Sequence, residues 1–250
     1  KTLPDNEVTV IHVDAHDRLW AATWFALSVL EPGGRIPRTI EFKGDASRCG
    51  IEITAMASAT DGTLWIGNHA GELCRISQSG EIAKLYQDDG KSPLFEAATP
   101  LTIHVQASGK LLVGTNAGLW QVDPKASSSR SIARHEESIG KDLIFALSSQ
   151  PDGTVWIGAE KGLYRLDPQT NAIPVLSDML PQRTARRAVV HHARNGSHWI
   201  GSYYGLYRRR ATPAKNSDLD EGLGVDSGVI KIVEDLDGGL WFASNSQGIF

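Results

Sequence analysis

The chain has 250 residues, with 41% hydrophobic and 22% charged residues, a net charge of -4 and a pI near 6.1. This composition is ordinary for a globular protein, and the mild negative charge gives no electrostatic reason to expect nucleic acid as a partner. No apolar run approaches the ~20 residues that span a bilayer. Because the chain starts at Lys1 without a methionine, we expect it to be processed or excised, so a leader or membrane anchor can have been removed.

Six variants of one short motif follow one another along the chain. The fourth, residues 152–167, is the most complete. It has a tight turn at Asp152-Gly153, an apolar strand around Trp156, a second turn at Gly162 and another apolar strand. Turn residues on both sides of short β-prone runs predict a β-hairpin. A single hairpin of this size is marginal in water, so the repetition is expected to form the fold.

The six copies are evenly spaced. The residues at the position of Trp156 are, in chain order, Trp20, Trp65, Leu112, Trp156, Trp199 and Trp241. Their spacings are 45, 47, 44, 43 and 42 residues. The first copy departs from the pattern because Arg18 replaces the turn glycine, and the third because Leu112 replaces tryptophan.

A period of 40 to 50 residues with four short strands per unit is typical of propeller blades. No segment has a sustained helical period, and a solenoid is disfavoured because its repeats are usually shorter or helical. We therefore predict an all-β fold, a β-propeller of four-stranded antiparallel blades forming one sensor domain over 1–250. The approximate predicted blades are 8–47, 51–95, 100–140, 143–184, 188–224 and 229–250.

Both ends of the repeat array are expected to be incomplete. Seven residues precede the first strand, and the last copy stops before its third strand is complete, so neither end supplies the outer strand of the sixth blade. An unclosed ring leaves sheet edges and apolar faces exposed. We expect the segment to belong to a longer protein with a seven-bladed ring, alone or in tandem with another.

The motif Asp-Gly-x-Leu/Val-Trp-Ile-Gly-x-x-x-Gly-Leu-Tyr-Arg-Leu-Asp resembles the two-component regulator propeller repeat. Residues 152–167 match it almost position for position, and 61–76, 109–123, 195–208 and 237–250 match in part. The resemblance implies a non-catalytic, ligand-sensing periplasmic domain of a bacterial inner-membrane signalling protein. It also implies downstream kinase or cyclase domains on the same polypeptide, and a homodimeric full-length receptor.

Two other functions stay open. Residues 71–82 are similar to the repeat of the streptogramin lyases, which are propeller enzymes, although the Trp-Ile-Gly and Gly-Leu-Tyr-Arg variants fit the regulator family better. A lyase-like enzyme is the first alternative and would need histidines and glutamates that converge on the channel mouth. A scaffold that binds only proteins is the second, and would need a broad exposed apolar patch.

Functional residues should differ from blade to blade, because the repeated ones are needed in every blade for packing. The loop between the second and third strands and the connection to the next blade are expected on one face, the usual ligand face. The candidate ligand-binding residues in these loops are Trp24, His69, Asn116, Lys141, Lys161, Arg183, Arg186, Arg187, Tyr203, Tyr204 and Asn245.

Basic side chains lie beside tyrosines in the loops of the fourth and fifth copies. This combination favours a small-molecule or carbohydrate ligand, an anionic one in particular, through charge-assisted hydrogen bonds and ring stacking. The alternatives are a solvated surface of mixed charge and a contact with the rest of the protein.

The eight histidines do not indicate a catalytic site. His191 and His192 are adjacent on a predicted strand, so their side chains should point to opposite faces and not ligate one ion easily. His12 and His104 hold equivalent inner-strand positions and are interpreted as structural, and His198 is expected in the turn before Trp199. We expect no metal, no cofactor and no catalytic residue in this segment.

Two cysteines occur, and they do not form a CxxC pair. Cys74 lies in a strand pattern and is predicted to be a buried thiol, with a disulfide to Cys49 as the alternative. Two cysteines do not decide the compartment.

Overall fold

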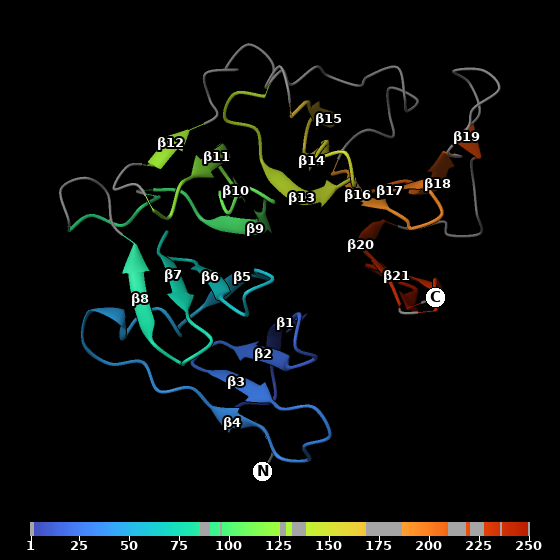
Figure 1. Cartoon of the computed structure of the whole chain (residues 1–250). Coiled ribbons are helices and arrows are strands. Elements are labelled where there is room, and N and C mark those ends of the chain that lie inside the picture. The colour runs from blue at the N-terminus through green and yellow to red at the C-terminus, as the bar shows by residue number, and fades with distance from the viewer. Residues whose placement is uncertain are drawn as a thin grey trace. The chain divides into compact units, whose positions relative to one another are not determined.

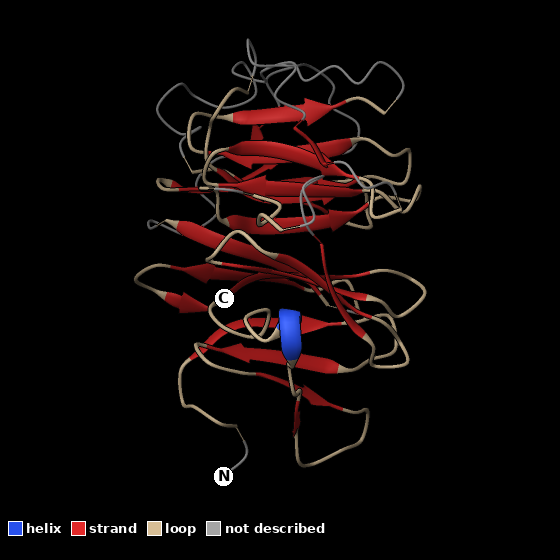
Figure 2. Ribbon diagram, turned by 90° about the vertical axis from the view of Figure 1, so that its left-hand side faces the viewer, coloured by secondary structure: helices blue, strands red, loops and turns tan. Residues whose placement is uncertain are grey.

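The computed structural model describes residues 3–85, 91–95, 97–125, 129–131, 139–168, 187–209, 219–220, 228–235 and 237–249. In this part of the chain the fold is all-β apart from one short 3-10 helix, η1 (Gly44–Ala46) (Figure 2). No helix among these residues is long and apolar enough to cross a membrane. The chain divides into two compact units, Lys1–Ile132 and Ala133–Phe250, which are described separately.

The first unit contains three four-stranded antiparallel sheets, each made of consecutive strands (Figure 1). The first sheet is β1 (Val8–Val13), β2 (Leu19–Thr23), β3 (Leu27–Leu30) and β4 (Arg38–Thr39). The second sheet is β5 (Ile53–Ser58), β6 (Leu64–Asn68), β7 (Leu73–Ile76) and β8 (Ile82–Leu85). The third sheet is β9 (Pro100–Val105), β10 (Leu111–Thr115), β11 (Gly118–Val122) and β12 (Ser129–Ser131).

The second unit contains three further antiparallel sheets. The fourth sheet is β13 (Ile144–Ser149), β14 (Val155–Ala159) and β15 (Leu163–Leu166). The fifth sheet is β16 (Val189–His192), β17 (His198–Ser202), β18 (Gly205–Arg209) and β19 (Leu219–Asp220). The sixth sheet is β20 (Val229–Glu234), β21 (Leu240–Ser244) and β22 (Gly248–Ile249). The predicted fourth strand of the fourth blade, 172–176, lies outside the described residues.

The sequence-based prediction of an all-β chain built from small antiparallel sheets is confirmed, with six such sheets in the described residues. The Asp-Gly turns form as expected. Gly153 has φ 86°, a conformation that favours glycine, and the Asp152 carboxylate accepts a hydrogen bond from the backbone N–H of Thr154 at 2.8 Å. This local hydrogen bond fixes the turn between the first two strands of the fourth sheet.

The core of each unit consists of side chains packed between neighbouring sheets. Trp20, from the first sheet, packs with Ile53 and Leu64 of the second, and Trp156 of the fourth sheet packs with Val190 and other residues of the fifth. Leu112 is fully buried at the position where other sheets have tryptophan. Trp20, Trp65 and Trp156 are therefore packing residues, whereas Trp199 is partly buried and Trp241 of the sixth sheet is 53% exposed.

Two aspartates satisfy the indole N–H groups of the first and last tryptophans. Trp20 Nε1 donates to Asp14 at 2.8 Å, and Trp241 Nε1 donates to Asp235 at 2.9 Å, six residues earlier in both cases. Gln150 and Ala193 occupy the corresponding positions before Trp156 and Trp199. The Nε1 atoms of these two tryptophans are buried and have no hydrogen-bond partner within the described ranges.

Asp14 is the best-connected carboxylate in the first sheet. It accepts hydrogen bonds from the backbone N–H groups of His16 and Arg18, from Arg18 Nε and from Trp20 Nε1. Burial alone raises its pKa, but the hydrogen bonds outweigh that effect and hold the pKa below its ordinary value. The Asp14 carboxylate therefore stabilises the folded protein at pH values above the pKa that Asp14 has in the unfolded chain. This stabilisation is lost as the pH falls through the lower pKa that Asp14 has in the folded protein.

Replacement Asp14→Asn is accordingly expected to lower the free energy of unfolding at pH 7 by about 1–3 kcal/mol, since charged hydrogen bonds to a buried group are lost. The difference between variant and wild type should shrink as the pH is lowered below about 4. Urea unfolding at pH 7 and at pH 3, monitored by tryptophan fluorescence, measures this difference in the free energy of unfolding. Asp61→Asn is the comparison variant. Asp61 lies at an exposed turn and its carboxylate is held mainly by Thr63, which also lowers its pKa, so its effect should be smaller and should change with pH in the same direction. A difference that is independent of pH would contradict the electrostatic account.

The prediction of a buried thiol at Cys74 is wrong, because Cys74 forms a disulfide with Cys49. Both residues are buried. Cys49 lies in the segment that enters the second sheet, and Cys74 lies on β7 of that sheet, so the fold brings together two residues 25 positions apart. The bond ties the connection between the first two sheets to the interior of the second.

Candidate functional site

The two kinds of loop expected on one face are hydrogen-bonded to each other. In the first unit, His69 N–H donates to the Glu52 carbonyl at 3.0 Å. In the second unit, Asn245 N–H donates to the Gly228 carbonyl at 2.9 Å. In both cases the donor lies after the second strand of a sheet and the acceptor lies just before its first strand. The prediction that these loops share one face holds within each unit.

The described candidate residues are all exposed. They are Trp24, His69, Asn116, Lys141, Lys161, Arg187, Tyr203, Tyr204 and Asn245. Arg183 and Arg186 lie outside the described residues. Trp24, His69 and Asn116 belong to the first unit and the other six to the second.

A cavity of about 200 Å³ in the second unit brings three of the candidates together. The variable-loop pocket is lined by Phe145, Arg187, Val189, Tyr203, Gly228, Val229, Ile230 and Asn245. Arg187, Tyr203 and Asn245 come from the loops of the fifth and sixth sheets, whereas Phe145 comes from β13 of the fourth. The predicted face therefore has a hollow at these sheets.

Arg187 is held at the pocket by three contacts. Its guanidinium lies over the Phe145 ring at 5.2 Å, its Nε lies 3.4 Å from Glu160 Oε2, and its backbone N–H donates to the Glu160 carbonyl at 3.3 Å. The φ of Arg187 is 54°, in the left-handed region that non-glycine residues rarely adopt. Glu52 and Ala97, in the connections that precede the second and third sheets, share this conformation with φ values of 52° and 59°, so it is a feature of these connections.

Tyr203, which lines the same pocket as Arg187, and its neighbour Tyr204 present two exposed rings. The rings meet edge to face with centroids 5.3 Å apart, and they are 57% and 53% exposed. Tyr204 N–H donates to the buried Ser202 hydroxyl at 3.1 Å, which fixes the turn that carries both rings. Exposed aromatic rings on a fixed turn can stack on a sugar or another planar group.

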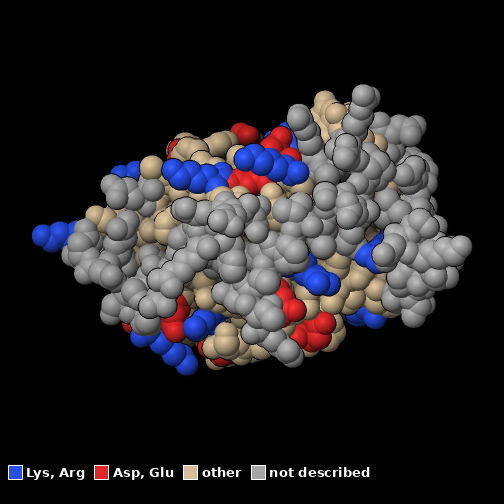
Figure 3. All heavy atoms as spheres, turned by 90° about the horizontal axis from the view of Figure 1, so that it is seen from above, with Lys and Arg blue, Asp and Glu red and all other residues tan. Residues whose placement is uncertain are grey.

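Lys141 and Lys161 are not among the pocket residues. The backbone N–H of Lys161 donates to Asp142 at 3.1 Å, and the Tyr164 hydroxyl donates to the same carboxylate oxygen at 3.1 Å. Burial, assisted by Asp142, raises the pKa of Tyr164 to about 12. Asp142 is thus a buried structural acceptor. On the face shown in Figure 3, basic and acidic side chains of the described residues lie side by side.

Sequence reasoning did not identify Phe145, Gly228 and Ile230 as pocket residues. Each lies in or next to a first strand, where side chains were expected to serve the core. Ile230 is nevertheless 52% exposed. The aromatic ring of Phe145 near the start of β13 is the one signal that could have indicated the apolar wall of the pocket.

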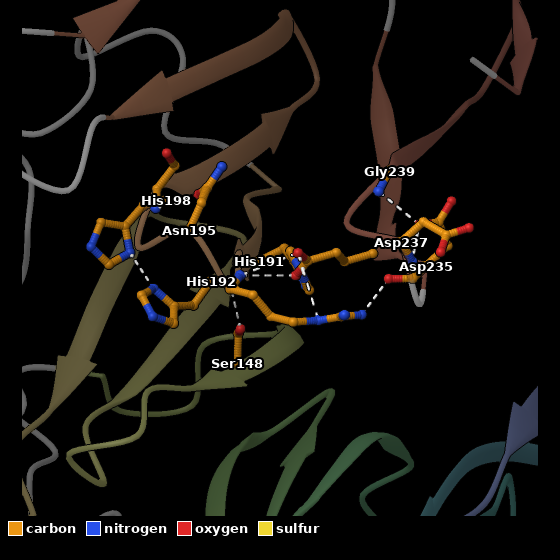
Figure 4. Close-up of polar contacts among 11 residues, drawn as sticks. Ser148, His191, His192, Asn195, His198, Asp235, Asp237 and Gly239 are labelled. Carbon is orange, nitrogen blue, oxygen red and sulfur yellow. Dashed lines mark hydrogen bonds and ion pairs between the residues drawn. The ribbon is translucent and has the colours of Figure 1, made fainter.

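A second polar group lies at the other end of the fifth sheet, around the turn between β16 and β17 (Figure 4). His191 Nε2 lies 3.3 Å from Glu234 Oε2 of the sixth sheet, whereas the His192 ring faces His198, with their Nδ1 atoms 3.4 Å apart. The prediction that His191 and His192 point in opposite directions is confirmed. Arg194 N–H also donates to Glu234, at 3.0 Å.

The predicted place of His198 is wrong. It lies at the start of β17, directly opposite His192, and not in the turn. The turn lies one residue earlier than expected, between His192 and His198, and within it the Asn195 side chain accepts the Ser197 N–H at 2.9 Å. Burial, and then the neighbouring His192 and Arg209, lower the pKa of His198 to about 4. Burial and His191 also lower the pKa of His192, and they outweigh Asp152 and Glu234, which raise it.

In the described part of the chain, no group of three or more His, Cys, Asp or Glu side chains is arranged to hold a metal ion. His12 and His104 lie opposite Trp20 and Leu112, so the prediction that they hold equivalent positions is confirmed. His12 Nε2 is hydrogen-bonded to Ser58 Oγ of the second sheet at 2.9 Å. Burial lowers the pKa of His104, in line with a structural role.

No protein-family model matches the chain, and no curated protein matches it. Several solved structures, in contrast, are similar to it. The extracellular domain of a putative hybrid two component system from B. thetaiotaomicron matches with a TM-score of 0.75 and 16% identity, over 100% of this chain and 34% of that one. A structure of YCF48 bound to D1 peptide matches with a TM-score of 0.71 and 13% identity, over 100% and 79%.

A streptogramin B lyase structure also matches, with a TM-score of 0.68 and 14% identity, over 99% of this chain and 79% of that one. At these identities the comparisons show the fold, that of a β-propeller. The chain spans about a third of the B. thetaiotaomicron extracellular domain. The three proteins differ in function, so the fold does not select among them.

Proposed function

We propose that this chain is the extracytoplasmic, ligand-sensing propeller of a bacterial transmembrane signalling protein, and that it binds its ligand in the variable-loop pocket. The observation that carries the proposal is the meeting of Arg187, Tyr203 and Asn245 at one cavity on the loop face. The structural similarity to an extracellular domain of a two component system supports it. The Cys49–Cys74 disulfide fits an extracytoplasmic location, because disulfides persist in oxidising compartments.

The residues of the pocket favour an acidic sugar. Arg187 offers a guanidinium for a carboxylate, Tyr203 a ring for stacking on a pyranose face, and Asn245 an amide for hydroxyl groups. The cavity of about 200 Å³ is smaller than the ~300–1,000 Å³ of sites for drug-sized ligands. A single sugar ring, or the terminal unit of a longer chain, is the size of ligand that we infer.

In this proposal the chain itself performs no catalysis. A ligand that contacts both Tyr203 and Asn245 connects the fifth and sixth sheets and favours the arrangement in which both loops reach it. It can shift the receptor only by the difference between its affinities for the two arrangements. The downstream domains of the same polypeptide would respond to that shift, in a homodimeric receptor.

Loss of sugar binding on removal of the pocket side chains tests this function. Tyr203→Ala and Arg187→Ala should each weaken binding of glucuronate or galacturonate oligosaccharides about 5- to 30-fold, since a stacked ring or charged contact contributes ~1–2 kcal/mol. Isothermal titration calorimetry on the purified chain measures it. Lys161→Ala is the matched control, because Lys161 is exposed on the same face but outside the pocket. Equal affinity in all four proteins, or no binding of acidic or neutral sugars, would overturn the proposal.

A peptide ligand is the second candidate. It is favoured by the similarity to a peptide-bound YCF48 structure and by the apolar pocket residues Phe145 and Ile230. Binding of unstructured peptides, in a titration where sugars do not bind, would favour it. A lyase-like activity remains the enzymatic alternative, and it is assayed directly by opening of a streptogramin B ring.

A further inference from the structure

The hairpin formed by β16 and β17 places two imidazoles directly against each other. His192 and His198 are partners in the antiparallel register, and their Nδ1 atoms are 3.4 Å apart (Figure 4). Their ring centroids lie 4.9 Å apart, and the rings are inclined by 39°. Directly opposed residues on one face of a sheet are close enough for their side chains to act together.

The separation of the two nitrogens matches that of two ligands on one metal ion. Zinc–imidazole bonds of ~2.0–2.1 Å at tetrahedral angles place two ligand nitrogens about 3.3–3.4 Å apart. The Nδ1 atom of a neutral imidazole is a common ligand for Zn²⁺, Ni²⁺ and Cu²⁺. The spacing of the two Nδ1 atoms therefore suits one shared ion.

Neutral imidazole is the metal-binding form. Burial lowers the pKa of both His192 and His198, which favours that form. Asp152 and Glu234 favour positive charge at His192, whereas Arg209 disfavours it at His198.

We propose that His192 and His198 form a cross-strand site for a divalent transition-metal ion of the Zn²⁺, Ni²⁺ or Cu²⁺ type, bound through the two Nδ1 atoms. Water completes the coordination. Because the site lies at the β16–β17 turn, and the variable-loop pocket includes the loop after β17, the two sites are at opposite ends of that strand and do not depend on each other.

Neighbouring groups can hold His198 in the orientation that the ion needs. Gln150 Nε2 lies 3.4 Å from His198 Nε2, and the Trp156 ring lies 4.6 Å from the His198 ring. With an ion on Nδ1, the proton of His198 sits on Nε2. The Nε2–H of His198 then donates a hydrogen bond to the side-chain oxygen of Gln150. This requires only that the Gln150 amide be flipped, so that its oxygen and nitrogen exchange places. Gln150 is thus a positioning residue for the site.

Two protein ligands bind an ion more weakly than the three or four of a catalytic or structural zinc site, so we expect a dissociation constant on the order of 1–100 µM. Titration of the tag-free full chain with ZnCl₂ and NiCl₂ at pH 7.5 in a calorimeter should show one bound ion. His192→Ala and His198→Ala should each weaken it at least about tenfold. His191→Ala is the matched control, because its ring faces Glu234 instead, and it should leave the affinity unchanged.

A second measurement separates loss of the site from loss of the fold. Saturating zinc should raise the melting temperature of the wild type and of His191→Ala, but not that of His198→Ala, since only a protein that binds the ion is stabilised by it. Histidine proton resonances in an NMR titration with Zn²⁺ should shift for two residues. Equal zinc affinity in wild type and His198→Ala, or no binding below 1 mM, would overturn the proposal, as would shifts confined to other histidines.

Discussion

Removal of the disulfide by the double replacement Cys49→Ser and Cys74→Ser is expected to lower the free energy of unfolding by about 3–4 kcal/mol. The bond closes a loop with a sequence separation of 25 residues, and opening it gives the unfolded chain many more conformations. The two buried hydroxyl groups that replace the sulfurs add to the loss. Both cysteines lie in the packed group of side chains between the first and second sheets, so the effect is expected in the first unit.

Guanidinium unfolding under oxidising conditions measures this difference. Wild-type protein treated with a reductant provides the matched control and should unfold at nearly the same denaturant concentration as the double variant. Hydrogen exchange of β5 to β8 should accelerate more than that of β13 to β18. An unchanged midpoint in the variant would mean that the bond does not stabilise the native fold.

Replacement Gly158→Ala is expected to destabilise the second unit by about 3 kcal/mol or more, at the upper end of overpacking effects. Gly158 lies on β14 of the fourth sheet and packs against Ala188, where the chain enters the fifth sheet. A Cβ atom built there overlaps the carbonyl oxygen of Ala188 and meets the Ala146 side chain at 3.4 Å. Backbone atoms cannot turn away as a flexible side chain can, so the two sheets would have to separate.

Gly162→Ala is the matched control for this prediction. A Cβ at Gly162 meets nothing within 4 Å, so the replacement should change stability by less than about 1 kcal/mol. Hydrogen exchange of β13 to β18 in each variant reports the stability of the second unit directly. Similar protection in both variants would contradict the interpretation of the Trp-Ile-Gly glycine as a contact point between sheets.

The same close approach occurs in other copies of the motif. A Cβ at Gly67 would come within 2.5 Å of Pro100, and one at Gly201 within 2.6 Å of Val229. The motif therefore combines three local needs: a turn that glycine permits, a large buried ring, and a gap in the side chains where the next sheet's first strand passes. The turn and the ring are recognised from neighbouring residues in the chain, whereas the gap depends on a residue of the next sheet and is seen only in the structure.

The candidate site could be predicted only in part. The face and the loops that form it followed from the strand order, and they led to Arg187, Tyr203 and Asn245. The side chains of Phe145 and Ile230 were missed because a residue near the start of an inner strand can point either to the core or to a cavity. That choice depends on the packing of neighbouring sheets, which no local pattern describes.

The sequence by itself determined the elements: six evenly spaced repeats, antiparallel strands, glycine turns and the repeated tryptophan, because these depend on residues a few positions apart. Only the tertiary structure decided which distant residues meet. The Cys49–Cys74 bond joins the entry of one sheet to its third strand, and the pocket draws on three sheets. The His192–His198 contact is set by the pairing register of β16 and β17, and a shift of one residue along a strand reverses the side of the sheet to which each side chain points.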